Sequence, residues 1–153
     1  ILMGFVSGGV ARGFCVGIAV TLTISFFVEL QLFNFFVIAA TFLVTSIMFS
    51  LAGFINAVFA KTFDDISIVP NFVLLPLTYL GGMFYSIDIL PSFWRGISSF
   101  NPIYYLMDSF RLGFLGIGSV ELWKAFLIPI VMIVILALLA NNLLKKGVSI
   151  KTE

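Results

Sequence analysis

Long uncharged stretches alternate with short charged clusters along the whole chain. No Asp, Glu, Lys or Arg occurs between Arg12 and Glu29, and the same holds for residues 33–60, 66–87 and 125–144. A helix of ~20 apolar residues crosses the ~30 Å hydrocarbon core of a bilayer. The pattern therefore predicts four membrane-spanning helices, at about residues 13–28, 35–60, 66–85 and 123–144.

Small and polar residues inside the first two predicted spans indicate how they pack. Gly13 and Gly17 have the small-xxx-small spacing that lets two helices approach closely, which favours helix packing over a ligand role. Asn56, near the end of the second span, is expected to form an interhelical hydrogen bond rather than to contact substrate.

The third predicted span carries residues that interrupt a helix. Pro70 and Pro76 each lack a backbone donor, and the pair Gly81-Gly82 follows them. We therefore expect this span to be bent or broken. At membrane depth, the freed backbone groups must find partners on neighbouring helices or in a water-filled cavity.

Residues 88–121 predict two helices that are too short to span a membrane. One begins near Pro91, and the other begins with the N-cap Asn101 and Pro102, runs to about Leu112 and stops at Gly113. Their aromatic residues suit the membrane interface, so we interpret them as interfacial or re-entrant half-helices. Asp108 and Arg111 are spaced i, i+3 and are expected to pair on one helix face.

Composition excludes several classes of function. The 153 residues are 61% hydrophobic and 10% charged, against about 25% charged in soluble domains. The net charge of +1 and the lack of a basic run give no indication of nucleic-acid binding. With no histidine and one cysteine, Cys15, a His-ligated metal and a His general base are excluded, and Cys15 is expected to be a packing residue.

Two carboxylates, Asp64 and Asp65, lie just before the third span. They are favoured there because carboxylates stabilise the positive end of a helix. A paired-carboxylate metal site is the alternative, although no third ligand is near in sequence.

Basic residues predict the orientation of the spans. With the C-terminus in the cytoplasm, five basic residues lie inside, and these are Arg12, Lys61, Lys145, Lys146 and Lys151. Three lie outside, and these are Arg95, Arg111 and Lys124. This bias has the sign of the positive-inside rule and places the half-helices on the outer face.

The interiors of the predicted spans hold no charged residue or histidine. Ion-coupled carriers usually keep such groups there to bind the coupling ion, so this absence argues against a self-powered carrier. The chain also has no G-x-x-x-x-G-K-[ST] run that could cradle ATP. Any energy for transport is therefore expected to come from another chain, and no enzymatic activity is predicted.

Three stretches carry a resemblance to a known family. They are Val69-Pro-Asn-Phe-Val-Leu-Leu-Pro-Leu-Thr-Tyr-Leu-Gly-Gly-Met-Phe-Tyr-Ser-Ile-Asp88, Leu90-Pro-Ser-Phe-Trp94 and Asn101-Pro-Ile-Tyr-Tyr-Leu-Met-Asp-Ser-Phe-Arg-Leu-Gly-Phe-Leu-Gly116. They closely resemble the C-terminal signature of ABC exporter permeases of the type 2 family. Gly8-Gly-Val-Ala-Arg-Gly13 is similar to the family's entry into its third span.

The resemblance implies an all-α polytopic fold in which residues 1–153 form a single transmembrane permease domain. The four spans and two outer half-helices would be spans three to six of a six-span permease with both ends cytoplasmic. The apolar start at Ile1 agrees with an N-terminal part that is missing. The family's permeases dimerise and dock separate ATPase subunits, so Gly8, Gly9 and Arg12 are expected near the ATPase interface. A plain positive-inside anchor is the alternative role for Arg12.

The leading hypothesis is the permease subunit of an ATP-driven exporter in the bacterial inner membrane. Its substrate would be amphiphilic, drug-like, or a polysaccharide or lipid-linked molecule, by similarity of Leu-Thr-Tyr-Leu-Gly-Gly-Met-Phe-Tyr-Ser to drug- and polysaccharide-type permeases. ATP and Mg²⁺ would sit on the partner ATPase, and this chain would hold no cofactor. Membrane lipid and a second permease copy are the other expected partners.

The candidate residues for the substrate path are Pro76, Tyr79, Gly81 and Gly82, and Tyr79 is equally interpretable as an interfacial anchor. Half of an ion-coupled secondary carrier and a non-transporting membrane scaffold are the alternative functions. No inverted repeat is visible to favour the carrier, and a scaffold needs neither a broken span nor half-helices.

Overall fold

The computed structural model describes residues 1–85 and 87–145, and within them the chain is helical with no strand. The long helices are α1 (Leu2–Ser25), α2 (Phe35–Phe59) and α7 (Leu122–Lys145). A fourth helical run, Phe63–Leu80, is also long and apolar enough to cross a membrane. The chain is therefore an all-α polytopic membrane protein, as the hydropathy pattern predicted. Lys146 and Lys151, which the orientation prediction used, lie outside the described residues.

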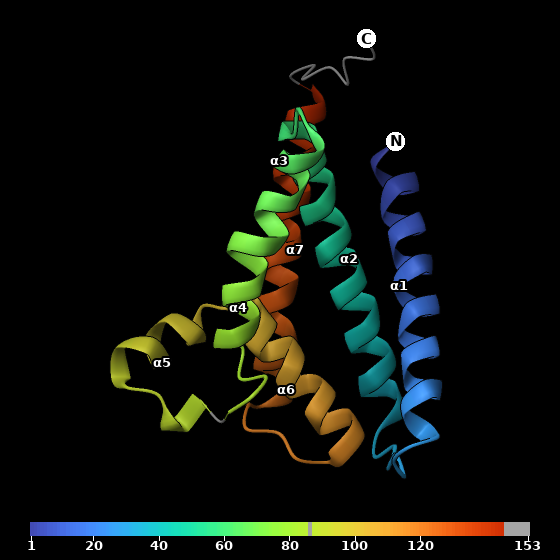
Figure 1. The fold of residues 1–153 in the computed structure, drawn as a ribbon, viewed down its shortest axis with the longest axis vertical. Coiled ribbons are helices and arrows are strands. Elements are labelled where there is room, and N and C mark those ends of the chain that lie inside the picture. The colour runs from blue at the N-terminus through green and yellow to red at the C-terminus, as the bar shows by residue number, and fades with distance from the viewer. Residues whose placement is uncertain (86, 146–153) are drawn as a thin grey trace.

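Helix α2 is the centre of the bundle. It packs against α1 on one side and against α7 and α6 (Pro102–Leu115) on the other (Figure 1). Buried Leu51 and Phe54 of α2 meet Ala140 of α7 in the main apolar cluster. Helix α5 (Ser92–Ser99) projects to the side of the bundle, as Figure 1 shows.

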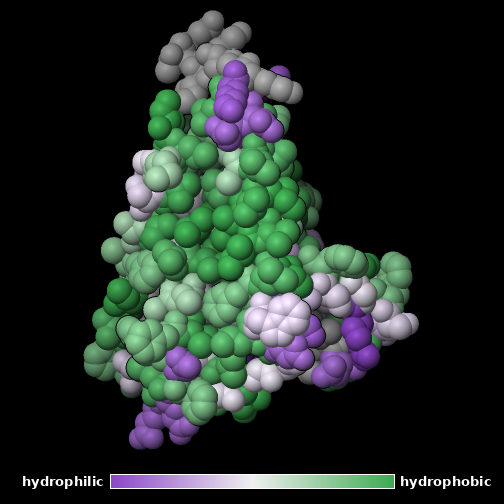
Figure 2. Space-filling model, turned by 180° about the vertical axis from the view of Figure 1, so that it is seen from behind, coloured by the Kyte–Doolittle hydropathy of each residue, from purple (hydrophilic) through white to green (hydrophobic). Residues whose placement is uncertain are grey.

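The two ends of the bundle differ in structure. The N-terminus and the end of α7 lie together at one end, which we call the terminal end (Figure 1). Helix α6 and the loops of residues 26–34 and 116–121 lie at the opposite end, which we call the half-helix end. Figure 2 shows a broad hydrophobic surface between hydrophilic clusters towards these two ends, as expected for a bundle whose middle faces lipid.

A glycine seam, formed by Gly9, Gly13 and Gly17, joins α1 to α2. A Cβ atom added at Gly13 would lie 2.2 Å from Ser46 Oγ, and one at Gly17 would lie 2.3 Å from a ring carbon of Phe42. At Gly9 an added Cβ would overlap the side chain of Ser50. Because the contacts run backwards along α2, the two helices are antiparallel. The predicted close approach at Gly13 and Gly17 is confirmed.

Helix α1 begins much earlier than the sequence predicted. We expected the first span to start near Gly13, after Arg12, but the helix begins at Leu2 and ends at Ser25. Arg12 therefore lies inside the helix, beside Gly13, which packs against Ser46 near the middle of α2. The prediction was wrong because one arginine does not end an apolar helix, since its long side chain can reach towards the interface.

The broken span starts at a capping box. The Thr62 hydroxyl accepts from the Asp65 N–H, and the Asp65 carboxylate accepts from the N–H groups of Lys61 and Thr62 at 3.0 Å each. These bonds fix the start of α3 (Phe63–Ile68) three residues earlier than predicted. They also give Asp65 a structural role, and among the described residues no three His, Cys, Asp or Glu side chains form a metal-binding group.

Pro70 breaks the helical hydrogen bonding of this span. It opens a π-helical segment, Val69–Leu74, in which the Leu75 N–H donates to Pro70 O, five residues back. Because Pro70 has no N–H, it cannot satisfy the carbonyl of Ile66, four residues earlier. The Asn56 side chain of α2 donates to that carbonyl at 2.9 Å. The predicted interhelical hydrogen bond of Asn56 and the predicted break are both confirmed.

Glycines end both α4 (Leu75–Leu80) and α6. Gly81 and Gly82 follow α4, and Gly82 has a positive φ of 79°. The predicted span to Tyr85 therefore stops five residues earlier. Helix α6 continues past Gly113 and ends at Gly116, whose φ is 71°. Gly113 is instead a packing glycine, where an added Cβ would lie 2.5 Å from Ile38 of α2.

Candidate functional site

The end of the broken span is held by the start of α6. Asn101 is 2% exposed, and its Nδ2 donates to Leu77 O of α4 at 2.6 Å. Its Oδ1 accepts from the Ile103 N–H at 3.0 Å, which makes Asn101 the predicted N-cap of α6. One buried amide therefore satisfies a carbonyl at the C-terminus of α4 and a donor at the N-terminus of α6.

A second polar contact holds the backbone just after α4. Arg111 Nη2 donates to Gly82 O at 3.2 Å, from the last half of α6. Gly81 packs at the same place, and an added Cβ there would lie 3.1 Å from Ile103 Cγ2. We call Leu77, Gly81, Gly82, Asn101 and Arg111 the α4–α6 junction.

Asp108 connects α6 to the start of α7. It is 2% exposed, and its carboxylate accepts from the Ser119 N–H at 3.0 and 3.1 Å and from the Val120 N–H at 3.0 Å. These bonds order the loop of residues 116–121, from which α7 begins. The buried charge is stabilised because backbone donors surround it.

The expected ion pair between Asp108 and Arg111 is not formed. In the described part of the chain, the ion pair present is Lys124–Glu121, at 3.0 Å. The i, i+3 spacing allowed the pair, but each side chain instead bonds to backbone groups outside α6, Asp108 to N–H groups of the 116–121 loop and Arg111 to the carbonyl of Gly82. The backbone N–H groups stabilise the carboxylate of Asp108 without Arg111, so the Arg111 side chain can reach Gly82 O.

Replacement of Asp108 by alanine is expected to lower the free energy of unfolding by about 1.5–3 kcal/mol, because the Ser119 and Val120 N–H groups lose a charged acceptor. Asp108→Asn keeps one acceptor oxygen and should lose less. Unfolding of the purified variants in mixed micelles measures this loss.

Glu121→Gln is the matched control for Asp108. Glu121 is exposed in the same loop, and hydrogen bonds from Lys124 and Trp123 hold its pKa below the usual value. A solvent-exposed pair of this kind contributes little to stability. Equal losses for Asp108→Ala and Glu121→Gln would contradict the role given to Asp108.

The residues predicted to line the substrate path fall into two environments. Gly81 and Gly82 are buried in the α4–α6 junction. Pro76 and Tyr79 are exposed on α4, and the Tyr79 ring stacks on Phe84 with centroids 5.5 Å apart. The structure therefore brings the two glycines to a contact between helices and leaves the proline and tyrosine on an outer face.

The residues predicted near an ATPase also differ from one another. Gly8 is exposed, with nothing within 4 Å of an added Cβ, whereas Gly9 is in the glycine seam. Arg12 is exposed on α1, level with the middle of α2. Of the three, Gly8 is the one that lies near the terminal end and is exposed, with space around it for a partner.

The sequence did not predict the long-range hydrogen-bond partners in the site. Asn-Pro at residues 101 and 102 signalled a helix start, but nothing in the sequence linked Asn101 to Leu77, 24 residues away. The partners of Asp108, Ser119 and Val120, were missed for the same reason. The sequence did indicate that partners would be needed there, because a broken span leaves backbone carbonyls without helical hydrogen bonds.

Comparison with known proteins gives a family match over most of the chain. The family described as "ABC-2 type transporter" matches residues 1–115. That range includes α1, α2, the broken span and α6. No solved structure matches the chain.

Several relatives are similar over almost the whole chain. The proteins named "Inner membrane transport permease YadH" from Escherichia coli K12, Escherichia coli O157:H7 and Shigella flexneri are each 53% identical over 147 residues. The match covers 96% of this chain and 57% of each relative. The chain thus spans a little over half the length of these relatives.

Proposed function

Since this chain belongs to the ABC-2 type transporter family, we propose that it forms membrane-spanning helices of an ATP-binding-cassette exporter permease. The permease works in the bacterial inner membrane, with the C-terminus in the cytoplasm. A separate ATPase subunit supplies the energy, and two permease copies enclose the path. The observation that carries this proposal is the family match, and the relatives named as inner membrane transport permeases support it.

Helix α4 is the element that we propose to move during transport. It is joined to the rest of the span by a π-helical segment, and the glycines Gly81 and Gly82 follow it, the second with a positive φ. Such interruptions let a helix change direction with small backbone adjustments. ATP-driven movement at the terminal end would tilt α3 and α4, and the α4–α6 junction would transmit that tilt to the half-helix end.

The substrate is proposed to be amphiphilic, either drug-like or a lipid-linked or polysaccharide molecule. The exposed face of α4 offers Pro76 and Tyr79, and Phe84 of the following segment stacks on Tyr79. A face of this kind contacts hydrophobic parts of a substrate and provides one phenolic hydroxyl for a polar part. The ATPase contact is proposed at the terminal end, near Gly8.

Energised uptake by inverted membrane vesicles tests the exporter proposal. Vesicles from cells that overproduce the permease with its ATPase should accumulate an amphiphilic fluorescent dye when ATP is added, and vanadate should abolish the uptake. Uptake that instead follows a proton gradient and ignores vanadate would favour the ion-coupled carrier.

Replacement of Arg12 by leucine is expected to stabilise the protein and to reduce transport. A charge within the hydrocarbon region costs about 2.5–3.5 kcal/mol on insertion scales, and the structure places Arg12 level with the middle of α2. We infer that an arginine at this depth has a role in transport. Thermal unfolding and vesicle uptake measure the two effects, with Lys124→Leu at the half-helix end as control. If vesicle uptake by Arg12→Leu is unchanged, Arg12 is a membrane anchor without a role in transport.

A further inference from the structure

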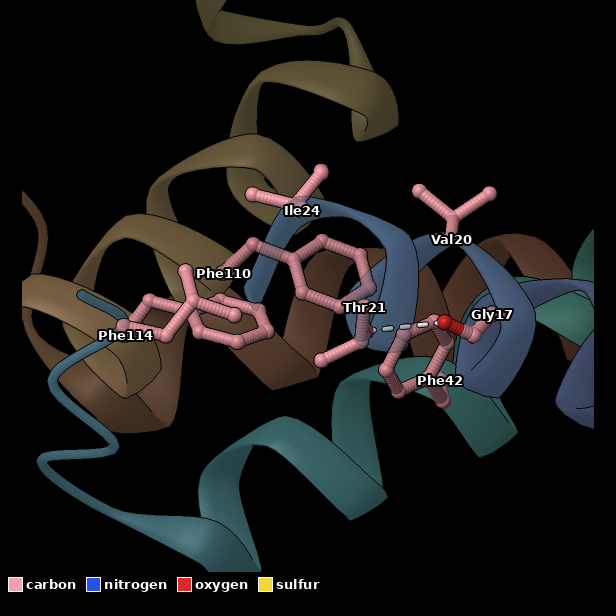
Figure 3. A pocket seen from close by; sticks show the side chains of 8 residues that line it. Gly17, Val20, Thr21, Ile24, Phe42, Phe110 and Phe114 are labelled. Atoms are coloured by element: carbon pink, nitrogen blue, oxygen red, sulfur yellow. Dashed lines mark hydrogen bonds between the residues drawn. The ribbon is translucent and has the colours of Figure 1, made fainter. Parts of the chain in front are cut away.

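An apolar cavity opens between α1, α2 and α6 towards the half-helix end. Its volume is about 320 Å³, and Figure 3 shows that side chains from these three helices surround it. A second cavity of about 240 Å³ shares Thr21, Phe42 and Phe114 with the first. The two cavities therefore adjoin across these three side chains.

Aromatic contacts hold the walls of the cavity in place. Phe42 of α2 and Phe110 of α6 meet edge to face, with ring centroids 4.9 Å apart. Phe110 stacks on Phe114 at 6.4 Å, and the Phe42 ring lies over Gly17, where an added Cβ would overlap it. Walls that interlock in this way give the cavity a defined shape.

The lining offers little to a polar ligand. Thr21 carries the hydroxyl in the lining of both cavities, and it already donates to Gly17 O at 2.8 Å (Figure 3). A water molecule needs two or more polar partners, and an apolar cavity without them stays dry. The lining therefore suits an apolar occupant, and in a bilayer hydrocarbon chains are the surrounding apolar material.

The depth of the cavity matches one leaflet of the bilayer. Gly17 lies about 12 Å below the end of α1 at Ser25, at the rise of an α-helix. The hydrocarbon of one leaflet is about 15 Å thick, half of the bilayer core. Leu30, in the loop that follows α1, lines the cavity at the half-helix end. An acyl chain that entered beside Leu30 would run along the cavity to Gly17.

Charge at the entrance indicates the headgroup. Glu29 and Gln31 flank Leu30, and both are exposed. A carboxylate at this position attracts a headgroup with a cationic amine and repels an anionic one. We propose that the cavity binds one acyl chain of an amine-headgroup phospholipid from the leaflet at the half-helix end. This site is separate from the proposed transport activity and does not depend on it.

Photolabelling in proteoliposomes tests the site. The probe is phosphatidylethanolamine with a diazirine at the middle of one acyl chain, and labelled positions are mapped by mass spectrometry. In the unmodified protein we expect labels on Phe42, Phe110 or Phe114. Thr21→Phe fills the cavity and should reduce that labelling by about fivefold or more, because the chain loses its volume.

Thr23→Phe is the matched control, because Thr23 is exposed on the same helix and its hydroxyl makes the same kind of bond, to Ala19 O at 2.8 Å. It should leave the labelling unchanged. If Thr21→Phe is not monodisperse, the pair Thr21→Leu and Thr23→Leu replaces it. Equal labelling in both variants of a pair would overturn the proposal.

Two further outcomes also contradict the site. If the lining residues stay unlabelled while lipid-facing Leu138 of α7 is labelled, protein rather than lipid fills the cavity. A phosphatidylglycerol probe should label the lining at least about twofold less than phosphatidylethanolamine, and Glu29→Gln should reduce that difference. Equal labelling by the two probes in the unmodified protein would overturn the headgroup assignment.

Discussion

Asn101→Leu is expected to lower the free energy of unfolding by about 2–4 kcal/mol, the sum of a lost N-cap and an unsatisfied buried carbonyl. The side chain donates to Leu77 O and accepts from the Ile103 N–H, and it is almost fully buried. Unfolding in mixed micelles measures the loss. Asn101→Ser keeps the cap but is too short to reach Leu77, so it should show the smaller part of the effect.

Asn34 provides the control for this prediction. It is also an N-cap asparagine, with Oδ1 accepting from the Phe36 and Val37 N–H groups at 3.1 and 3.2 Å, but it is exposed. Asn34→Leu should cost only the cap, about 0.5–2 kcal/mol. If Asn34→Leu and Asn101→Leu destabilise equally, the bond from Asn101 to α4 contributes nothing.

Leucine at Gly13 is expected to separate α1 from α2. The site has no room for even a Cβ, which would lie 2.2 Å from Ser46 Oγ and 3.0 Å from its Cβ. Overpacking of this kind typically costs about 1–3 kcal/mol, and a whole leucine adds three more carbon atoms. We therefore expect Gly13→Leu to unfold at a clearly lower temperature and to yield less monodisperse protein.

The control is Gly8→Leu on the same helix. Nothing lies within 4 Å of an added Cβ at Gly8, so this variant should be as stable as the unmodified protein or slightly more stable, since leucine favours a helix. A loss at Gly8 equal to the loss at Gly13 would show that leucine on α1 is harmful for a reason other than the glycine seam.

Span positions could be predicted because lipid imposes a simple requirement on composition. An apolar run of sufficient length identifies a helix in hydrocarbon, and the four predicted spans correspond to α1, α2, the run Phe63–Leu80 and α7. Boundaries were harder to predict. A charge such as Arg12 resembles the end of a span, although the helix depends on backbone hydrogen bonds that continue through it.

Side-chain partners in the site could be predicted only when they were local. The N-cap role of Asn101 follows from the next two residues of the chain, and it is confirmed. Its bond to Leu77 and the bond from Arg111 to Gly82 depend on how α4 and α6 meet. The predicted Asp108–Arg111 pair considered two residues on one helix, whereas both side chains bond to backbone groups outside that helix.

Isolation of the protein from its native membranes in mild detergent tests the central claim, that this chain is part of an ATP-driven permease. We expect an ATPase subunit to co-purify in roughly stoichiometric amount and its activity to be inhibited by vanadate. A pure permease without an ATPase partner, from membranes in which both genes are expressed, would contradict the account.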